Sequence, residues 1–189
     1  QRFINESCSY DRFGFAMIED QKATGANVPC WMIFDSQYRS KYGAGGLMPN
    51  VLMPDEKVPP EWWDTYIYRS ETIADLADKI GIDPAVLTVT IETTNRAAET
   101  GIDEMFGRGN DEFGRFIGDP GVKPNSCLGA INRAPFYAVR VDLGDLGNKG
   151  GLKAGADARV MREDGTPIEG LYAVGNCAGS PFGDTYPGA

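Results

Sequence analysis

The sequence predicts an α+β fold, and three observations support this. Apolar residues recur at helical spacing in two stretches that follow each other closely, 73–80 and 84–100. Short apolar runs at 31–34 and 136–141 are typical of strands. Beyond residue 143 the chain is glycine-rich and contains strand-like runs. We therefore expect a helical hairpin beside a small antiparallel sheet, followed by C-terminal strands that belong to another sheet.

The helical hairpin is also predicted from the residues at its ends. Ser70 is expected to cap the first helix, and Gly81 to end it. Asp83 and Pro84 give a second N-cap followed by proline at the first helical position, where its missing N–H has no helical partner to lose. Gly101 ends the second helix. The link between the two helices is therefore very short.

The other segments are assigned from turn residues and apolar runs. Glycines and prolines predict a loop at 43–60, and residues 101–133 are expected to hold little regular structure. A β-hairpin is predicted from 158–162 and 166–168, with a further strand at 170–175. The N-terminal residues suggest the middle of a strand. The aromatic cluster of residues 62–68 either covers the core or forms a wall against a flat apolar ligand.

Composition excludes several classes of partner and chemistry. The chain has 18 basic and 27 acidic residues and a net charge of −9, which argues against nucleic acid or an anionic membrane surface as partner. No apolar stretch is long enough for a transmembrane helix, and the N-terminus does not resemble a signal peptide. Four cysteines without Cys-x-x-Cys spacing indicate reduced thiols in a cytoplasmic protein. Histidine is absent, so no metal site is expected, and catalysis would need tyrosine, carboxylates, lysine or a cofactor.

Four stretches could carry chemistry. They are Arg-Phe-Ile-Asn-Glu followed by Tyr10, the loop 144–151, the strand and turn 170–179, and the Gly-Asp-Thr-Tyr-Pro-Gly run at 183–188. Glycines leave main-chain N–H groups uncovered, so that they can approach a planar ring or an oxyanion closely. A tyrosine among them adds a hydroxyl donor without a charge.

The order of these motifs resembles the FAD-dependent fumarate reductase and 3-ketosteroid dehydrogenase superfamily. An Arg-Phe-x-Asn-Glu strand is followed by a helical region, a Lys-Gly-Gly loop and the run DGTPIEGLYAVGN, and the resemblance covers essentially the whole chain. Residues 73–109 are similar to the cap (substrate) domain of these enzymes. The resemblance implies FAD as cofactor. It also implies a strand and turn leading from the flavin domain at 1–20, a cap domain at 21–142, and a return into an incomplete FAD-binding domain at 143–189.

The resemblance is closest to the steroid branch of the superfamily. Where dicarboxylate reductases carry a glutamate, a histidine and an arginine in the last motif, this chain has Asn176, Phe182 and Tyr186. Tyr10 stands at the position of their proton-donating arginine. A dicarboxylate needs paired positive charge, whereas these neutral groups suit an apolar ketone. The implied reaction introduces a double bond next to the ketone of a 3-ketosteroid.

The resemblance also implies roles for individual residues. Tyr10 would be the base that removes a proton, and Tyr186 would hydrogen-bond the ketone oxygen. Phe182 and Phe136 would line the steroid slot, although packing in the core explains them equally well. Lys149 is interpreted as a solvated loop charge. The residues expected to contact FAD are Gly150, Gly151, Gly175, Asn176, Pro187 and Gly188.

One departure from the family is large. There is no Gly-x-Gly-x-x-Gly motif after a strand, so the ADP part of FAD has no evident site. We therefore expect a piece of a longer chain that needs the remainder of the flavin domain as partner and is inactive alone. The alternatives are a 4-ene 3-ketosteroid or other enone reductase or dehydrogenase, a fumarate-reductase-like flavoprotein, and a non-enzymatic module that binds a hydrophobic ligand.

Overall fold

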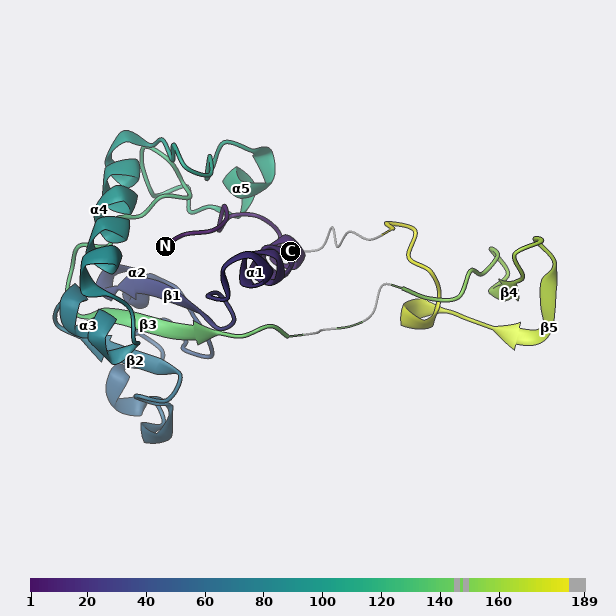
Figure 1. The fold of residues 1–189 in the computed structure, drawn as a ribbon, viewed down its shortest axis with the longest axis horizontal. Helices are drawn as coiled ribbons and strands as arrows, with labels where there is room; N and C mark the ends of the chain where they lie inside the picture. The colour runs from purple at the N-terminus through teal and green to yellow at the C-terminus, as the bar shows by residue number, and fades with distance from the viewer. Residues whose placement is uncertain (145–146, 148–149, 184–189) are drawn as a thin grey trace. The chain divides into compact units, whose positions relative to one another are not determined.

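The computed structural model describes residues 1–144, 147 and 150–183. It divides into two compact units. The first comprises residues 1–8 and 15–143, and the second residues 9–14 and 144–189. The units are described separately below, and Figure 1 gives the element labels.

The first unit is built on a three-stranded antiparallel sheet. Its strands are β1 (Cys30–Asp35), β2 (Ile67–Ser70) and β3 (Phe136–Val141), in the order β1-β3-β2. Cys30 pairs with Val141 across the first ladder, and Ile67 with Val139 across the second. Both apolar runs that predicted strands at 31–34 and 136–141 therefore form them, and β3 occupies the centre.

The predicted helical hairpin is confirmed as α3 (Ile73–Lys79) and α4 (Pro84–Thr100). Leu76 of α3 and Ile80, its C-cap residue, pack against Ala138 of the central strand, with Phe136 half-buried beside them. The second helix begins and ends as predicted, because Asp83 caps it and Gly101 takes the left-handed conformation at φ 77°.

The cap of the first helix differs from the prediction. Ser70 is the last residue of β2, and Thr72 is the N-cap instead. The extended backbone of Thr72 lets its hydroxyl accept a hydrogen bond from the N–H of Asp75 at 3.1 Å.

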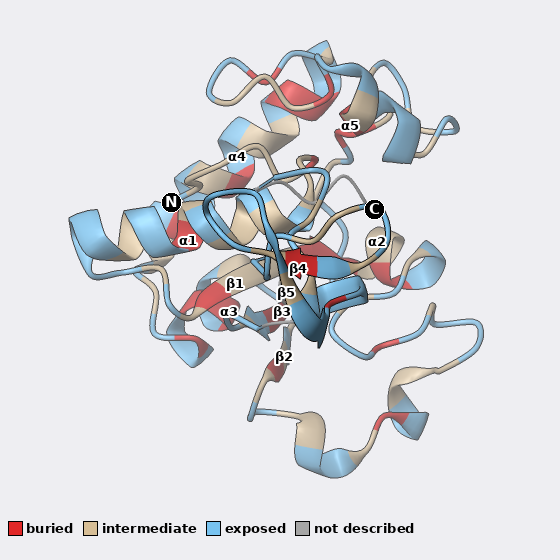
Figure 2. Ribbon diagram, turned by 90° about the vertical axis from the view of Figure 1, so that its right-hand side faces the viewer, coloured by how far each residue is buried: buried red, intermediate tan, exposed pale blue. Residues whose placement is uncertain are grey.

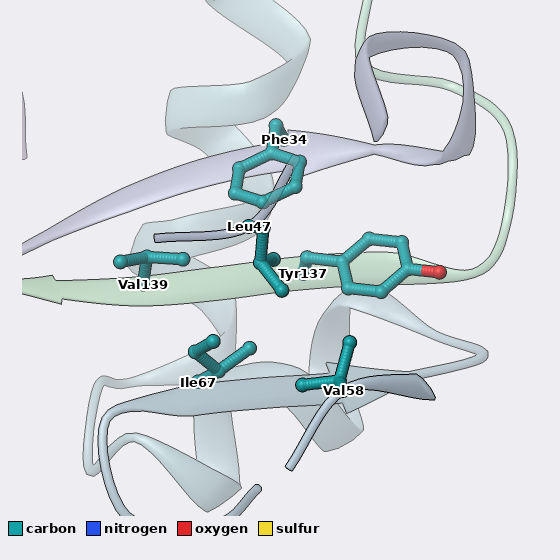
Figure 3. Close-up of a cluster of buried hydrophobic side chains, with 6 residues drawn as sticks. All are labelled: Phe34, Leu47, Val58, Ile67, Tyr137 and Val139. Carbon is teal, nitrogen blue, oxygen red and sulfur yellow. The ribbon is translucent and has the colours of Figure 1, made fainter. Parts of the chain in front are cut away.

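The main hydrophobic cluster of the first unit joins strands and loop. It comprises Phe34, Leu47, Val58, Ile67, Tyr137 and Val139 (Figure 3). Trp62, Trp63 and Tyr66 pack against this cluster, which supports the interpretation of the aromatic stretch as a cover of the core. Figure 2 shows buried residues in the sheet and the helical hairpin, whereas the loops are largely exposed or intermediate.

The predicted loop at 43–60 contains short 3₁₀ turns, at Asp55–Lys57 and from Pro60. It follows α2 (Ser36–Lys41), whose buried Arg39 is ion-paired to Asp55 at 3.2 Å and hydrogen-bonds the carbonyl groups of Met48 and Met53. One buried guanidinium therefore ties together three positions within the loop.

The strand expected around the N-terminus is wrong, whereas the 101–133 excursion holds little regular structure, as expected. Residues 1–8 form no strand, and α1 (Tyr10–Thr24) replaces the expected strand and turn. Met17 of this helix is buried, and ion pairs rather than a ladder fix the preceding residues. Residues 101–133 contain α5 (Glu112–Ile117), whose N-cap Asp111 accepts from the N–H of Gly114 at 2.7 Å.

The second unit contains a β-hairpin of β4 (Arg159–Met161) and β5 (Pro167–Tyr172). The hairpin prediction is confirmed, but the separate strand predicted at 170–175 is wrong. Gly170 adopts φ 75° within β5, so the chain continues as one strand through the position where a break was expected. A 3₁₀ turn, Gly175–Cys177, follows.

Cys30, Cys127 and Cys177 form no disulfide bond with one another within the part of the chain that the structure describes. Among the helices of residues 1–144, 147 and 150–183, none is both long and apolar enough to cross a membrane.

Candidate active site

The second unit brings two of the predicted glycine motifs together. The segment 150–152 lies beside 177–179 through a parallel bridge between Leu152 and Ala178. The N–H of Leu152 donates to the carbonyl of Cys177, and the N–H of Gly179 donates to the carbonyl of Leu152, both at 2.9 Å. Main-chain hydrogen bonds thus hold the Gly-Gly loop against the turn that follows the last strand.

Gly151 is required by this contact. A Cβ added there would lie 2.4 Å from the carbonyl carbon of Ala178 and 2.5 Å from its oxygen. Both are backbone atoms, which cannot move aside as the end of a flexible side chain can. The close approach of the two segments therefore depends on the missing side chain.

We expect Gly151→Ala to separate the two segments, since overpacking costs about 1–3 kcal/mol. The bound FAD per protein should fall, as measured by flavin absorbance after gel filtration of a chain of the relatives' full length. Gly144→Ala is the matched control, because a Cβ at Gly144 meets nothing within 4 Å. Equal flavin contents of the two variants would contradict this account of the loop.

Asn176 lies at the same junction. Its side-chain nitrogen is 3.0 Å from the position of a Cβ on Gly147, so it closely approaches the 144–151 loop. Gly175 adopts φ 59° with open space around its Cα, and both residues are exposed. The turn therefore presents an uncovered main chain and a neutral amide side chain. Such a surface fits a planar, partly polar group such as a flavin ring or its ribityl chain.

Tyr10 is the first residue of α1 and is 45% exposed. The helix is held farther along by Met17, which is 1% exposed and lies against the thiol of Cys30, with 3.9 Å between the sulfur atoms. The predicted base thus stands at a helix start rather than at a strand end.

A network of charged side chains holds the segment before Tyr10, and the sequence did not indicate it. Arg2 donates two hydrogen bonds to Glu6, at 2.6 and 2.7 Å, and two to Asp103, at 2.9 and 2.8 Å. Arg108 donates from Nε to the hydroxyl of Ser7 at 3.0 Å. Burial alone would raise the pKa of Asp103, but hydrogen bonds from Arg2 and from the N–H of Arg108 outweigh it and lower that pKa.

Two tyrosines of the first unit, the buried Tyr137 and the half-buried Tyr42, are poor candidates for a base. Burial and a hydrogen bond to Asp55 raise the pKa of Tyr137 to about 12. Burial and a hydrogen bond to Asp119 likewise raise the pKa of Tyr42 to about 12. A carboxylate that accepts a hydrogen bond from the phenol O–H stabilises the neutral phenol and so raises the pKa of the tyrosine.

The two phenylalanines predicted to line the slot belong to different units. Phe136 packs against the cluster of Leu76, Ile80 and Ala138, whereas Phe182 of the second unit is 61% exposed. Their place in a substrate slot stays a prediction. Lys149, Tyr186, Pro187 and Gly188 lie outside the described residues.

Curated relatives cover the whole of this chain. It is 41% identical to 3-oxosteroid 1-dehydrogenase of Mycolicibacterium smegmatis, across 100% of this chain and 33% of that protein. It is 39% identical to 4-oxocyclohex-2-ene-1-carboxylate 5-dehydrogenase of Sinomonas cyclohexanicum, across 100% of this chain and 31% of that protein. The chain thus spans about a third of the length of the curated relatives it matches.

Solved structures agree with these relatives. The chain superposes with a TM-score of 0.91 and 46% identity on a 3-ketosteroid Δ1-dehydrogenase from Sterolibacterium denitrificans, solved in complex with 1,4-androstadiene-3,17-dione. This match covers 100% of the chain and 33% of that structure. A flavocytochrome c3 fumarate reductase in an open conformation superposes with a TM-score of 0.58 and 26% identity, over 95% of this chain and 26% of the other.

The FAD binding domain family matches residues 1–189. Together with the identity to 3-oxosteroid dehydrogenases over the whole chain, this match identifies FAD as the cofactor. The chain belongs to the FAD binding domain family of oxidoreductases.

Proposed function

We propose that the protein containing this chain is a flavin-dependent dehydrogenase that introduces a double bond α,β to the ketone of a 3-ketosteroid. The observation that carries the proposal is the exchange of cations for neutral groups. Tyr10, Phe182 and Tyr186 stand where dicarboxylate reductases of the superfamily carry arginine, histidine and arginine. A ketone needs a hydrogen-bond donor and an apolar slot rather than paired positive charge. The names of the 41% and 46% identical relatives support this substrate class.

In this proposal the two tyrosines divide the chemistry. Tyr10 removes the proton α to the ketone, and Tyr186 donates a hydrogen bond to the ketone oxygen as negative charge develops there. A free tyrosine has a pKa of about 10, so Tyr10 needs neighbouring groups that stabilise the phenolate. FAD, when bound, accepts a hydride from the adjacent carbon.

Three stretches of the chain would take different roles. Residues 21–142 form the cap domain over the substrate, and 143–189 return to the flavin domain, with residues 1–20 as the connection into the cap. The glycine junction of 150–152 with 177–179 supplies main-chain contacts to FAD, together with Gly175 and Asn176. Phe182 and Phe136 line the steroid slot. The hydrogen bonds that join the two glycine segments support the cofactor part of this assignment.

A single-ring ketone is the second candidate substrate. The 39% identical relative is named for dehydrogenation of a 4-oxocyclohexene carboxylate, which shares the ketone with a steroid ring A but adds a carboxylate. A carboxylate calls for a cation near the far end of the ring. The neutral Phe182 favours the steroid.

Analysis of products tests the proposal and separates it from its alternatives. A chain of the relatives' full length is incubated with a saturated 3-ketosteroid and an artificial electron acceptor, and the product is examined by NMR. We expect the new double bond at C1–C2 of ring A. A double bond at C4–C5 would assign the enzyme to the 4-ene alternative. Turnover of 4-oxocyclohexanecarboxylate but not of the steroid would favour the second candidate.

A further inference from the structure

The segment before Tyr10 is fastened by an unusually complete ionic network. The guanidinium of Arg2 engages both oxygens of Glu6 and both oxygens of Asp103, at distances of 2.6–2.9 Å. The Arg2 side chain is 11% exposed and that of Asp103 is 1% exposed. Bidentate contacts of this kind fix orientation as well as distance. The face of Arg2 also lies over the ring of Phe106, with 5.1 Å between Cζ and the ring centroid.

Asp103 also holds the shape of its own loop, residues 103–108. Asp103 accepts hydrogen bonds from the N–H groups of Met105 and Arg108, at 3.3 and 3.2 Å. Arg108 then returns to the segment by donating to the hydroxyl of Ser7, a residue that is 4% exposed. The loop 103–108 and the segment 2–7 therefore hold each other in place, although about a hundred residues separate them in sequence.

Tyr10 follows the segment 2–7 after only two intervening residues. It begins α1, which is anchored on its other side by the buried Met17. The start of the helix therefore follows directly on a segment that the network holds. Because the first turn of a helix has few intrahelical bonds of its own, the preceding segment determines where its first side chain lies.

We propose that Arg2 and Asp103 are positioning residues for Tyr10, which place its hydroxyl for proton removal without touching the substrate. The inference rests on the proposed function, in which Tyr10 is the base. A displacement of about 1 Å in a reacting group can cost roughly 10²-fold in rate. Loosening the network should therefore lower kcat and leave KM nearly unchanged.

The test uses two variants in a chain of the relatives' full length. Arg2→Lys keeps the charge but loses the fork that engages two carboxylates, and Asp103→Asn keeps the shape but loses the charge. The rate measured is the anaerobic reduction of bound flavin by a saturating 4-ene-3-ketosteroid, per bound flavin. Arg39→Lys is the matched control, because Arg39 is also buried, with its side chain 2% exposed, and is ion-paired to Asp55, but it holds the 43–60 loop. It should lower the melting temperature and leave the rate unchanged.

Combination with Tyr10→Phe separates positioning from general destabilisation. We expect Arg2→Lys and Asp103→Asn each to lower the rate by about 10- to 100-fold, with no further loss when either is added to Tyr10→Phe. A loss that multiplies with that of Tyr10→Phe, or no loss in either single variant, would overturn the positioning role. If Tyr10→Phe itself keeps the full rate, the base assignment fails first, and the positioning role falls with it.

Discussion

Tyr10→Phe should lower the rate of steroid dehydrogenation by roughly 10²–10⁴-fold, which is the range that a positioned general base contributes. The change removes only the phenolic oxygen, so the helix that begins at this residue keeps its apolar ring and its shape. Proton removal α to the ketone then has no acceptor in the site. The measurement is flavin reduction by a 3-ketosteroid under exclusion of oxygen, in a chain of the relatives' full length.

Tyr42→Phe is the control for this result. The substitution removes a hydrogen bond to Asp119, but Tyr42 has no part in the proposed reaction. The rate of the Tyr42→Phe enzyme should therefore match that of the unsubstituted enzyme. Bound flavin should be equal in all three proteins. A Tyr10→Phe enzyme that retains full turnover would show that the base lies elsewhere.

The second large effect is expected for Tyr186→Phe, with a loss of roughly 10²–10³-fold in kcat. This is the usual consequence of removing one donor from an oxyanion hole. The lost donor matters more as charge develops on the ketone oxygen, so kcat should fall more than the affinity for substrate. Steady-state kinetics over a range of steroid concentrations distinguishes the two.

Tyr172→Phe serves as the control for Tyr186→Phe. Tyr172 is the last residue of β5 and is 63% exposed, so its hydroxyl should not affect the rate. If Tyr186→Phe changes KM alone, the tyrosine contributes to binding and not to stabilisation of the oxyanion.

The helical hairpin could be predicted because its signals are local. Asp83 and Pro84 start the second helix, Gly101 ends it, and the apolar spacing between them holds the buried face. The central strand was also readable from its apolar run, since it is buried between neighbours on both sides. In both cases a short window of sequence contains the information that determines the element.

The wrong predictions concern segments whose local sequence does not determine their structure. Residues 1–8 resembled a strand, yet their partners are the side chains of Asp103 and Arg108, which no local pattern reveals. The strand expected at 170–175 was an error of turn chemistry, because Gly170 allows a positive φ without ending β5.

The candidate site was predictable in part. The glycines predict main chain that another group can approach closely. In the structure, the backbone of Ala178 approaches Gly151 in this way. That contact was not evident from the sequence, because two segments more than twenty residues apart create it. The role of Tyr10 is inferred from its place in a motif, where dicarboxylate reductases carry an arginine. That inference needs the sequence only and no structure.

The central claim is that a neutral, tyrosine-based site acts on a ring ketone rather than on a dicarboxylate. Its most direct test is the flavin absorbance of the full-length enzyme without oxygen. The account predicts that a 4-ene-3-ketosteroid bleaches oxidised flavin and that fumarate leaves chemically reduced flavin unchanged. Reoxidation of reduced flavin by fumarate, with no bleaching by the steroid, would contradict it.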